Sequence, residues 1–208
     1  MKKIMMVIAF CSFFLIQNGF SQNRFTISLG GGYIPPKLSD EKLTYWDTGS
    51  LFGLSAGWQV SNKTEMVLSA SYQKHQYADK HRGGIVPAVF RQLISKHTEN
   101  STVYDLSLAT RWTMSSKQIK PFIGTGVGLL LIDQGKIEAT YQMDSNSDPT
   151  TTVYSDSDKE YTVAAFNLDL GYEIGLKENV ALVLEGELIV GFNGPIYTPI
   201  TAAIKVVL

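Results

Sequence analysis

The chain has 208 residues, enough for one domain of moderate size. It carries 18 basic and 19 acidic residues, so we do not expect the basic surface of a nucleic-acid-binding protein. Charged residues make up only 18%, and no apolar run after residue 20 approaches the ~18 residues that a membrane-spanning helix needs.

The first residues have the pattern of an export leader. Lys2 and Lys3 are followed by the apolar run Ile4–Ile16, and Gly19 and Ser21 supply small side chains at positions −3 and −1 of a cleavage point before Gln22. An N-terminal anchor helix is the alternative, which the shortness of the run disfavours. We predict a signal peptide at 1–21, cleaved on export, and one mature domain at 22–208.

The mature chain is a succession of alternating segments. The clearest is Lys120–Ile132, in which Ile123 and Val127 share one face while Gly124 and Gly128 share the other. Glycine inside a strand indicates a crowded face, such as the inside of a small barrel. The eight segments of this kind are 25–33, 52–60, 66–73, 104–112, 120–132, 166–174, 182–190 and 200–208.

Connections between these segments alternate between long and short. This pattern predicts an all-β, eight-stranded antiparallel up-and-down barrel with short turns at one end and long loops at the other. Helical spacing after Pro87 predicts one short amphipathic helix across 87–94 in the second long loop. The inner parts of the longest loop, 133–160, are expected to extend their flanking strands.

Alternation alone does not separate a membrane barrel from a soluble, lipocalin-like one. The aromatic residues favour the membrane, because they lie at both ends of the apolar stripes, as interfacial belts do. From Tyr104 to Trp112 a strand rises ~26 Å, or about 20 Å after tilting, close to the membrane band of such barrels. The predicted belts are Phe25, Trp58, Trp112 and Tyr172 near the short turns and Tyr33, Phe52, Tyr72, Tyr104 and Phe166 near the long loops.

Three features carry a family resemblance: the SLGGGY opening, the KPFIGTGVG strand after a short turn, and an alternating final strand. By these features the mature chain resembles the small eight-stranded outer-membrane proteins of the OmpA/OmpX and opacity type, often labelled outer-membrane β-barrel or porin-family proteins. It departs at Leu208, where such proteins usually end in an aromatic residue. The resemblance implies export to the outer membrane of a Gram-negative bacterium, with short turns in the periplasm and long loops outside the cell.

Seven ionisable side chains are expected to project into the barrel. An eight-stranded barrel has an interior that side chains fill, so these charges should pair with one another and with trapped water. We favour a structural network, and a narrow polar or proton path is the alternative. The residues are Asp105, Arg111, Asp169, Glu173, Glu185, Glu187 and Lys205.

Two other constellations lie in predicted loops. Residues 144–148 have the D-x-N-x-D spacing of a calcium loop, but Pro149 and Ser155 stand where glycine and glutamate are needed, so we favour a solvated acidic loop. His75, His81 and His97 have no zinc spacing. Basic residues of the same loop would suit lipopolysaccharide phosphates. We therefore predict no metal and no cofactor.

The expected function is a structural or surface-interaction role, in adhesion or in the cell envelope, through long extracellular loops. A narrow porin-like channel is the alternative, and a lipid A-modifying enzyme is a weaker one. We see no catalytic triad or phosphate loop and predict that the protein is not an enzyme. Expected partners are outer-membrane lipids and lipopolysaccharide, with an unknown extracellular ligand, no nucleic acid, and a monomeric barrel.

Overall fold

The computed structural model of the protein describes residues 24–36, 46–77, 92–114, 118–135, 137–142, 150–155 and 160–208. The predicted signal peptide lies outside these residues. All of the described elements are β-strands. No helix long and apolar enough to cross a membrane occurs in the described part of the chain.

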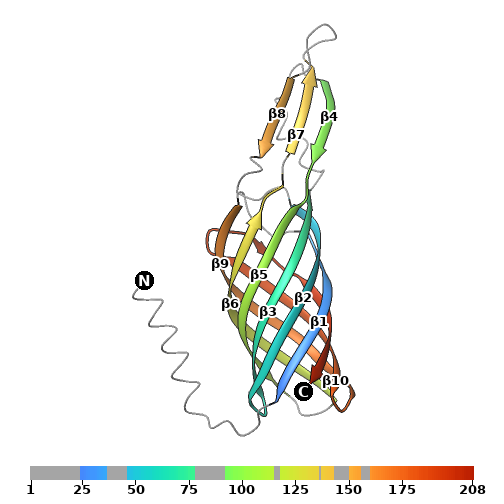
Figure 1. Cartoon of the computed structure of the whole chain (residues 1–208), viewed down its shortest axis with the longest axis vertical. Coiled ribbons are helices and arrows are strands. Elements are labelled where there is room, and N and C mark those ends of the chain that lie inside the picture. Colours follow the sequence, from blue (N-terminus) through green and yellow to red (C-terminus); the bar gives the residue numbers. More distant parts are fainter. Residues whose placement is uncertain are drawn as a thin grey trace, which may run out of the picture.

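Eight strands form a closed antiparallel barrel (Figure 1). Each strand pairs with its neighbour in the ring, and the pairing of the first strand with the last closes the cylinder. The predicted eight-stranded antiparallel architecture is thus confirmed. The strands are β1 (Phe25–Ile34), β2 (Trp46–Ser61), β3 (Thr64–Tyr77), β5 (Ser101–Thr113), β6 (Ile119–Asp133), β9 (Glu160–Lys177), β10 (Val180–Gly191) and β12 (Ile200–Val207).

The outer face of the barrel is apolar. Along β1, Ile27 and Leu29 are 44% and 51% exposed, whereas Thr26, on the opposite face, is only 3% exposed. Along β6, Leu131 is exposed on the outside, while Leu130 and Ile132 on either side of it are buried inside the barrel. A continuous exposed apolar surface of this extent is typical of a barrel that faces lipid, and a soluble cavity barrel would have the reverse alternation.

The glycines of β6 lie on the crowded inner face. A Cβ at Gly124 would come within 2.7 Å of Asp169 Oδ2, and one at Gly126 within 2.8 Å of Ala109 Cβ. Glycine therefore lets the neighbouring strands β5 and β9 extend their side chains over β6. The bare face predicted from the sequence leaves room for the polar side chains of the interior.

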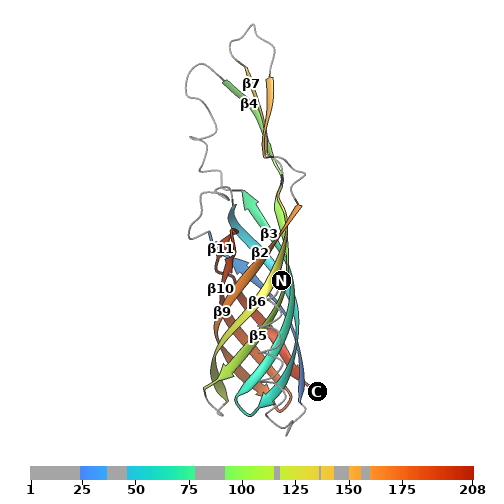
Figure 2. The ribbon, with the colours of Figure 1, turned by 90° about the vertical axis from the view of Figure 1, so that its left-hand side faces the viewer.

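A second sheet projects beyond one end of the barrel (Figures 1 and 2). It consists of β4 (Gln92–Thr98), β7 (Ile137–Gln142) and β8 (Thr150–Ser155), in the order β4-β7-β8. We call it the projecting sheet, and the barrel end from which it rises the loop end. The opposite end, where residues 62–63 and 178–179 join strands, is the turn end.

The projecting sheet continues the barrel wall. The order β4-β7-β8 repeats the order of β5, β6 and β9, to which these strands connect along the chain. The expected extension of the strands that flank 133–160 is thus confirmed. The helix predicted across 87–94 is wrong where the structure describes it, because residues 92–94 belong to β4, in which Gln92 and Leu93 pair with β7. Residues 87–91 lie outside the described residues.

The neck between barrel and projecting sheet is tight. The Gly135 amide donates a hydrogen bond to Ser101 Oγ at 3.1 Å. A Cβ at Gly135 would lie 2.7 Å from the carbonyl oxygen of Asn100, so a larger residue would push the two strands apart.

We expect Leu108→Arg to destabilise the barrel by about 2–4 kcal/mol, because Leu108 lies on the outer face, four residues from both Tyr104 and Trp112, where an arginine would meet the lipid midplane. The control is Leu176→Arg next to a turn, which should cost about 0–1 kcal/mol. Urea unfolding in lipid vesicles measures both. Equal costs would contradict a lipid-facing outer surface.

Candidate functional site

The interior of the barrel contains three layers of side chains. Ion pairs occupy the turn end, a polar cavity follows, and an apolar cluster fills the loop end. The structure places all seven predicted interior charges within the barrel, each at least partly buried. They divide between the first two layers.

The turn-end layer is a compact ionic network. Lys205 Nζ donates hydrogen bonds to Glu65 Oε2 at 2.7 Å and to Glu173 Oε2 at 2.8 Å. Lys120 Nζ donates to Glu173 Oε1 at 3.1 Å, and Thr26 Oγ1 donates to Glu65 Oε1 at 2.7 Å. Two lysines thus face two glutamates, so this layer is balanced in charge.

Two members of this network are absent from the sequence-based prediction. Glu65 lies one residue before the predicted segment 66–73, and Lys120 is the first residue of the predicted segment 120–132. Both side chains point inward, as those of Val67 and Phe122 do two residues further along their strands. Extending the alternation of 66–73 by one residue into the turn would have identified Glu65, and applying the alternation of 120–132 from its first residue would have identified Lys120.

Arg111 marks the boundary of the second layer. Its Nη2 donates to Glu185 Oε1 at 2.5 Å, and its guanidinium carbon lies 4.2 Å from the centre of the Phe122 ring. The ion pair links β5 to β10 across the interior. The aromatic ring covers the guanidinium face, where a cation–π contact compensates part of the lost hydration.

The second layer contains a cavity of about 100 Å³, which we call the polar cavity because charged side chains line part of it, beside apolar residues such as Leu51 and Val67. Asp105, Asp169, Glu185 and Glu187 line it, and Arg111 is the one cation among its lining residues. Asn167 Nδ2 donates to Glu187 Oε1 at 2.5 Å. In contrast to the turn-end layer, carboxylates here outnumber cations four to one.

Several acceptor atoms of this cavity have no hydrogen-bonding protein partner. They are Asp105 Oδ1, Asp169 Oδ1 and Asn167 Oδ1, on side chains that are 7%, 4% and 1% exposed. Buried acceptors without donors are costly. The cavity is large enough for several water molecules, since each needs about 10–15 Å³.

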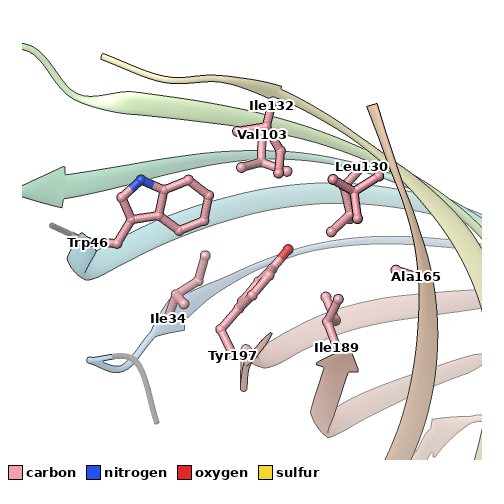
Figure 3. Packing of buried hydrophobic residues seen from close by; sticks show 9 residues of the cluster. Ile34, Trp46, Val103, Leu130, Ile132, Ala165, Ile189 and Tyr197 are labelled. Atoms are coloured by element: carbon pink, nitrogen blue, oxygen red, sulfur yellow. The ribbon is translucent and has the colours of Figure 1, made fainter. Parts of the chain in front are cut away.

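The loop end of the barrel is filled by an apolar cluster, which we call the plug (Figure 3). Trp46 stacks on His75 with ring centroids 4.1 Å apart, and Tyr197 packs edge-on to both rings. Aliphatic side chains from other strands of the barrel complete it. The plug residues are Ile34, Trp46, Val103, Leu130, Ile132, Val163, Ala165, Ile189 and Tyr197.

The connection between β10 and β12 contributes the centre of the plug. Asn193 adopts a left-handed φ of 61°, which asparagine tolerates better than most residues. The Gly191 amide donates to the Pro195 carbonyl at 2.9 Å, so the chain reverses. A two-residue strand, β11 (Ile196–Tyr197), then pairs with Ile189 and Val190, which directs the fully buried Tyr197 inward. The sequence analysis predicted only a connection between the segments 182–190 and 200–208.

The three histidines and the D-x-N-x-D segment noted in the sequence do not form a site within the described residues. His75 packs against Trp46 and Tyr197 of the plug, and His97 lies in β4. His81 and residues 144–148 lie outside the described residues. Among the side chains that are described, no three His, Cys, Asp or Glu groups are arranged to hold a metal ion directly.

The predicted belt residues lie on the outer surface. Eight of them are 40–57% exposed, and Trp58 is half-buried. Tyr72 and Tyr104 contact each other near the loop end, with ring centroids 5.4 Å apart.

Replacing the buried Lys205 tests the turn-end layer. Lys205→Met should cost about 3–5 kcal/mol, because it leaves two buried glutamates without their shared cation. Lys120→Met is the control: the Lys120 side chain is 36% exposed, and its ion pair should be worth less than about 1 kcal/mol. Urea unfolding compares the two variants. Adding Glu65→Gln to Lys205→Met should recover part of the loss, and a Lys205→Met variant no less stable than Lys120→Met would contradict the network.

Comparison with known proteins gives structural matches only, since no family model and no curated sequence matches the chain. Neisserial surface protein A has a TM-score of 0.51 and 11% identity, over 89% of this chain and 97% of that chain. A major outer membrane protein from Thermus thermophilus has a TM-score of 0.50 and 10% identity, over 90% and 100%. Ail of Yersinia pestis has a TM-score of 0.46 and 9% identity, over 89% and 98%. Taken with the closed ring of eight antiparallel strands, the first two matches show that this chain has the fold of the small outer-membrane β-barrels.

Proposed function

We propose that the protein is an outer-membrane barrel that presents the projecting sheet outside the cell as a surface for interaction. The observation that carries the proposal is the continuation of three wall strands into β4, β7 and β8 beyond the end of the barrel (Figures 1 and 2). A rigid barrel thereby holds a β-sheet at a defined position above the membrane. The fold and the lipid-facing exterior support this location.

The outer edges of the projecting sheet are suited to strand addition. In the described residues, β4 and β8 each pair only with β7, so each has one free edge. Edge strands are commonly protected by charge or proline, yet Thr150–Ser155 contains neither. An extended segment of a partner can pair with such an edge through its backbone, which is a common mode of peptide recognition.

The plug favours this role over that of a channel. Nine apolar or aromatic residues close the loop end of the lumen, and the ionic network crosses the turn end. The interior is therefore filled at both ends of the polar cavity.

The remaining parts of the proposal concern the environment. Lipids surround the apolar band, and lipopolysaccharide phosphates would meet the basic residues in the loop that precedes β4. The barrel acts as a monomer and carries no catalysis. Lipid mass spectrometry of a deletion strain tests the last point, and an altered lipid A profile would contradict it.

Trimming the projecting sheet tests the interaction role. We expect replacement of residues 137–155 by a short Gly/Ser linker to reduce adhesion of cells that display the barrel at least about tenfold, since it removes β7 and β8 and leaves β4 unpaired. The matched control replaces residues 35–45, which join β1 to β2 rather than to a strand of the projecting sheet. Heat-modifiable migration on gels checks that both variants fold. Unchanged adhesion after loss of 137–155 would contradict the proposal.

Planar-bilayer recording tests the closed lumen. The unaltered barrel should show no discrete conductance, because the plug excludes ions and water from the loop end. Trp46→Gly combined with Tyr197→Gly removes the two rings at the centre of the plug, and any conductance that it opens should stay small because the ionic network still crosses the turn end. Discrete conductance of the unaltered barrel would favour the channel alternative.

A further inference from the structure

The polar cavity of the second layer has an unbalanced charge. Glu185 is paired with Arg111, but Asp105, Asp169 and Glu187 have no ion-pair partner among the described residues. Buried charges in a low-dielectric interior need compensation by a counter-charge or by loss of ionisation. The turn-end network does not supply it, because both of its lysines are already paired with Glu65 and Glu173.

A second observation is independent of the carboxylates. The Asn167 side chain is 1% exposed and lines the same cavity, and its Nδ2 is committed to Glu187. Its Oδ1 has no protein donor. An amide oxygen is always an acceptor, whatever the pH, so this atom calls for a donor or a cation within the cavity.

We propose that the barrel binds a small hydrated cation in this cavity. Carboxylate and amide oxygens are ligands that hard cations such as Na⁺, Mg²⁺ and Ca²⁺ prefer. The cavity of about 100 Å³ accommodates a cation with part of its water shell. Asp105, Asp169 and Asn167 would hold the ion largely through water, which agrees with the lack of three acidic or histidine groups close enough for direct coordination in the described structure.

The cation would act as a structural counter-ion. Asp105 belongs to β5, Asn167 and Asp169 to β9, and Glu187 to β10, so a single ion connects strands on both sides of the bare β6 face. Because binding requires the closed barrel, the ion stabilises the folded state over the unfolded one. This inference does not depend on the projecting sheet or on its partners.

Unfolding in defined salts tests the proposal. The barrel is refolded in zwitterionic micelles and unfolded in urea at constant ionic strength, with NaCl, MgCl₂ or CaCl₂ replacing N-methylglucamine chloride, whose cation is too large for the cavity. With at least one metal, the ratio of folded to unfolded protein should rise about tenfold for each tenfold increase in free cation above its dissociation constant. Equal urea midpoints in all four salts would overturn the proposal and indicate that protons neutralise the cavity.

Matched variants locate the effect. Asp105→Asn should abolish the cation dependence, and Asp169→Asn serves the same purpose if the first variant fails to refold. Glu178→Gln removes the same charge from an exposed turn and should keep the full dependence. Metal content after dialysis, measured by plasma mass spectrometry, should fall in parallel in the cavity variants alone. Cation dependence that persists in both cavity variants would overturn the site.

Discussion

The pairing of β1 with β12 is the constraint on which the rest of the structure depends. In lipid, no water is present to satisfy a backbone amide or carbonyl, so a sheet that spans the membrane must have no free edge within it. Eight registered Cα pairs from Thr26–Val207 to Tyr33–Ile200 close the ring here. Closure with only eight strands leaves a narrow interior, and this narrowness forces glycine onto the inner face of β6 and brings charged groups from distant strands into contact.

Along the barrel axis, the interior has layers that differ in charge. At the turn end, lysine and glutamate are matched pair by pair, with distances of 2.7–3.1 Å. In the cavity above, carboxylates are the predominant charged groups, and above them the plug is apolar apart from the polar atoms of its Trp46 and Tyr197 rings. A solute entering from either end meets a different barrier, ionic on one side and apolar on the other.

Much of this arrangement follows from the alternation of side chains along each strand, in which every second residue points to the same face. Alternation places Asp105, Asp169 and Lys205 inside and Leu106 and Leu170 outside without any knowledge of the partners, because the two faces of a strand meet lipid and lumen. Strand limits are harder to predict: Glu65 lies outside its predicted segment because its strand runs further toward the turn than the apolar stripe does. Lys120 stands at the very start of its predicted segment, ahead of the apolar stripe. The sequence does not predict which interior charges pair with one another, because the shear and tilt of the strands in the ring decide which side chains meet across the lumen.

The loop end was the least predictable part. Val89, Phe90, Leu93 and Ile94 recur at helical spacing, but pairing with β7 places Leu93 and its neighbours in a strand instead. The plug likewise depends on tertiary structure, because Tyr197 reaches the lumen only through the reversal at Asn193. One sequence feature did indicate apolar filling at this end: Leu130 and Ile132 lie on the same face of β6 as its glycines, and that face points into the barrel.

The continuity of wall and projecting sheet has a mechanical consequence. Tension on the projecting sheet is transmitted through the neck at Gly135 and Ser101 into β5, β6 and β9, along the direction of these strands. Force parallel to antiparallel strands loads many backbone hydrogen bonds at once in shear, whereas force across an edge opens them one by one. β6 shares fifteen registered pairs with β9 alone, so the barrel wall resists a pull that is applied along its strands.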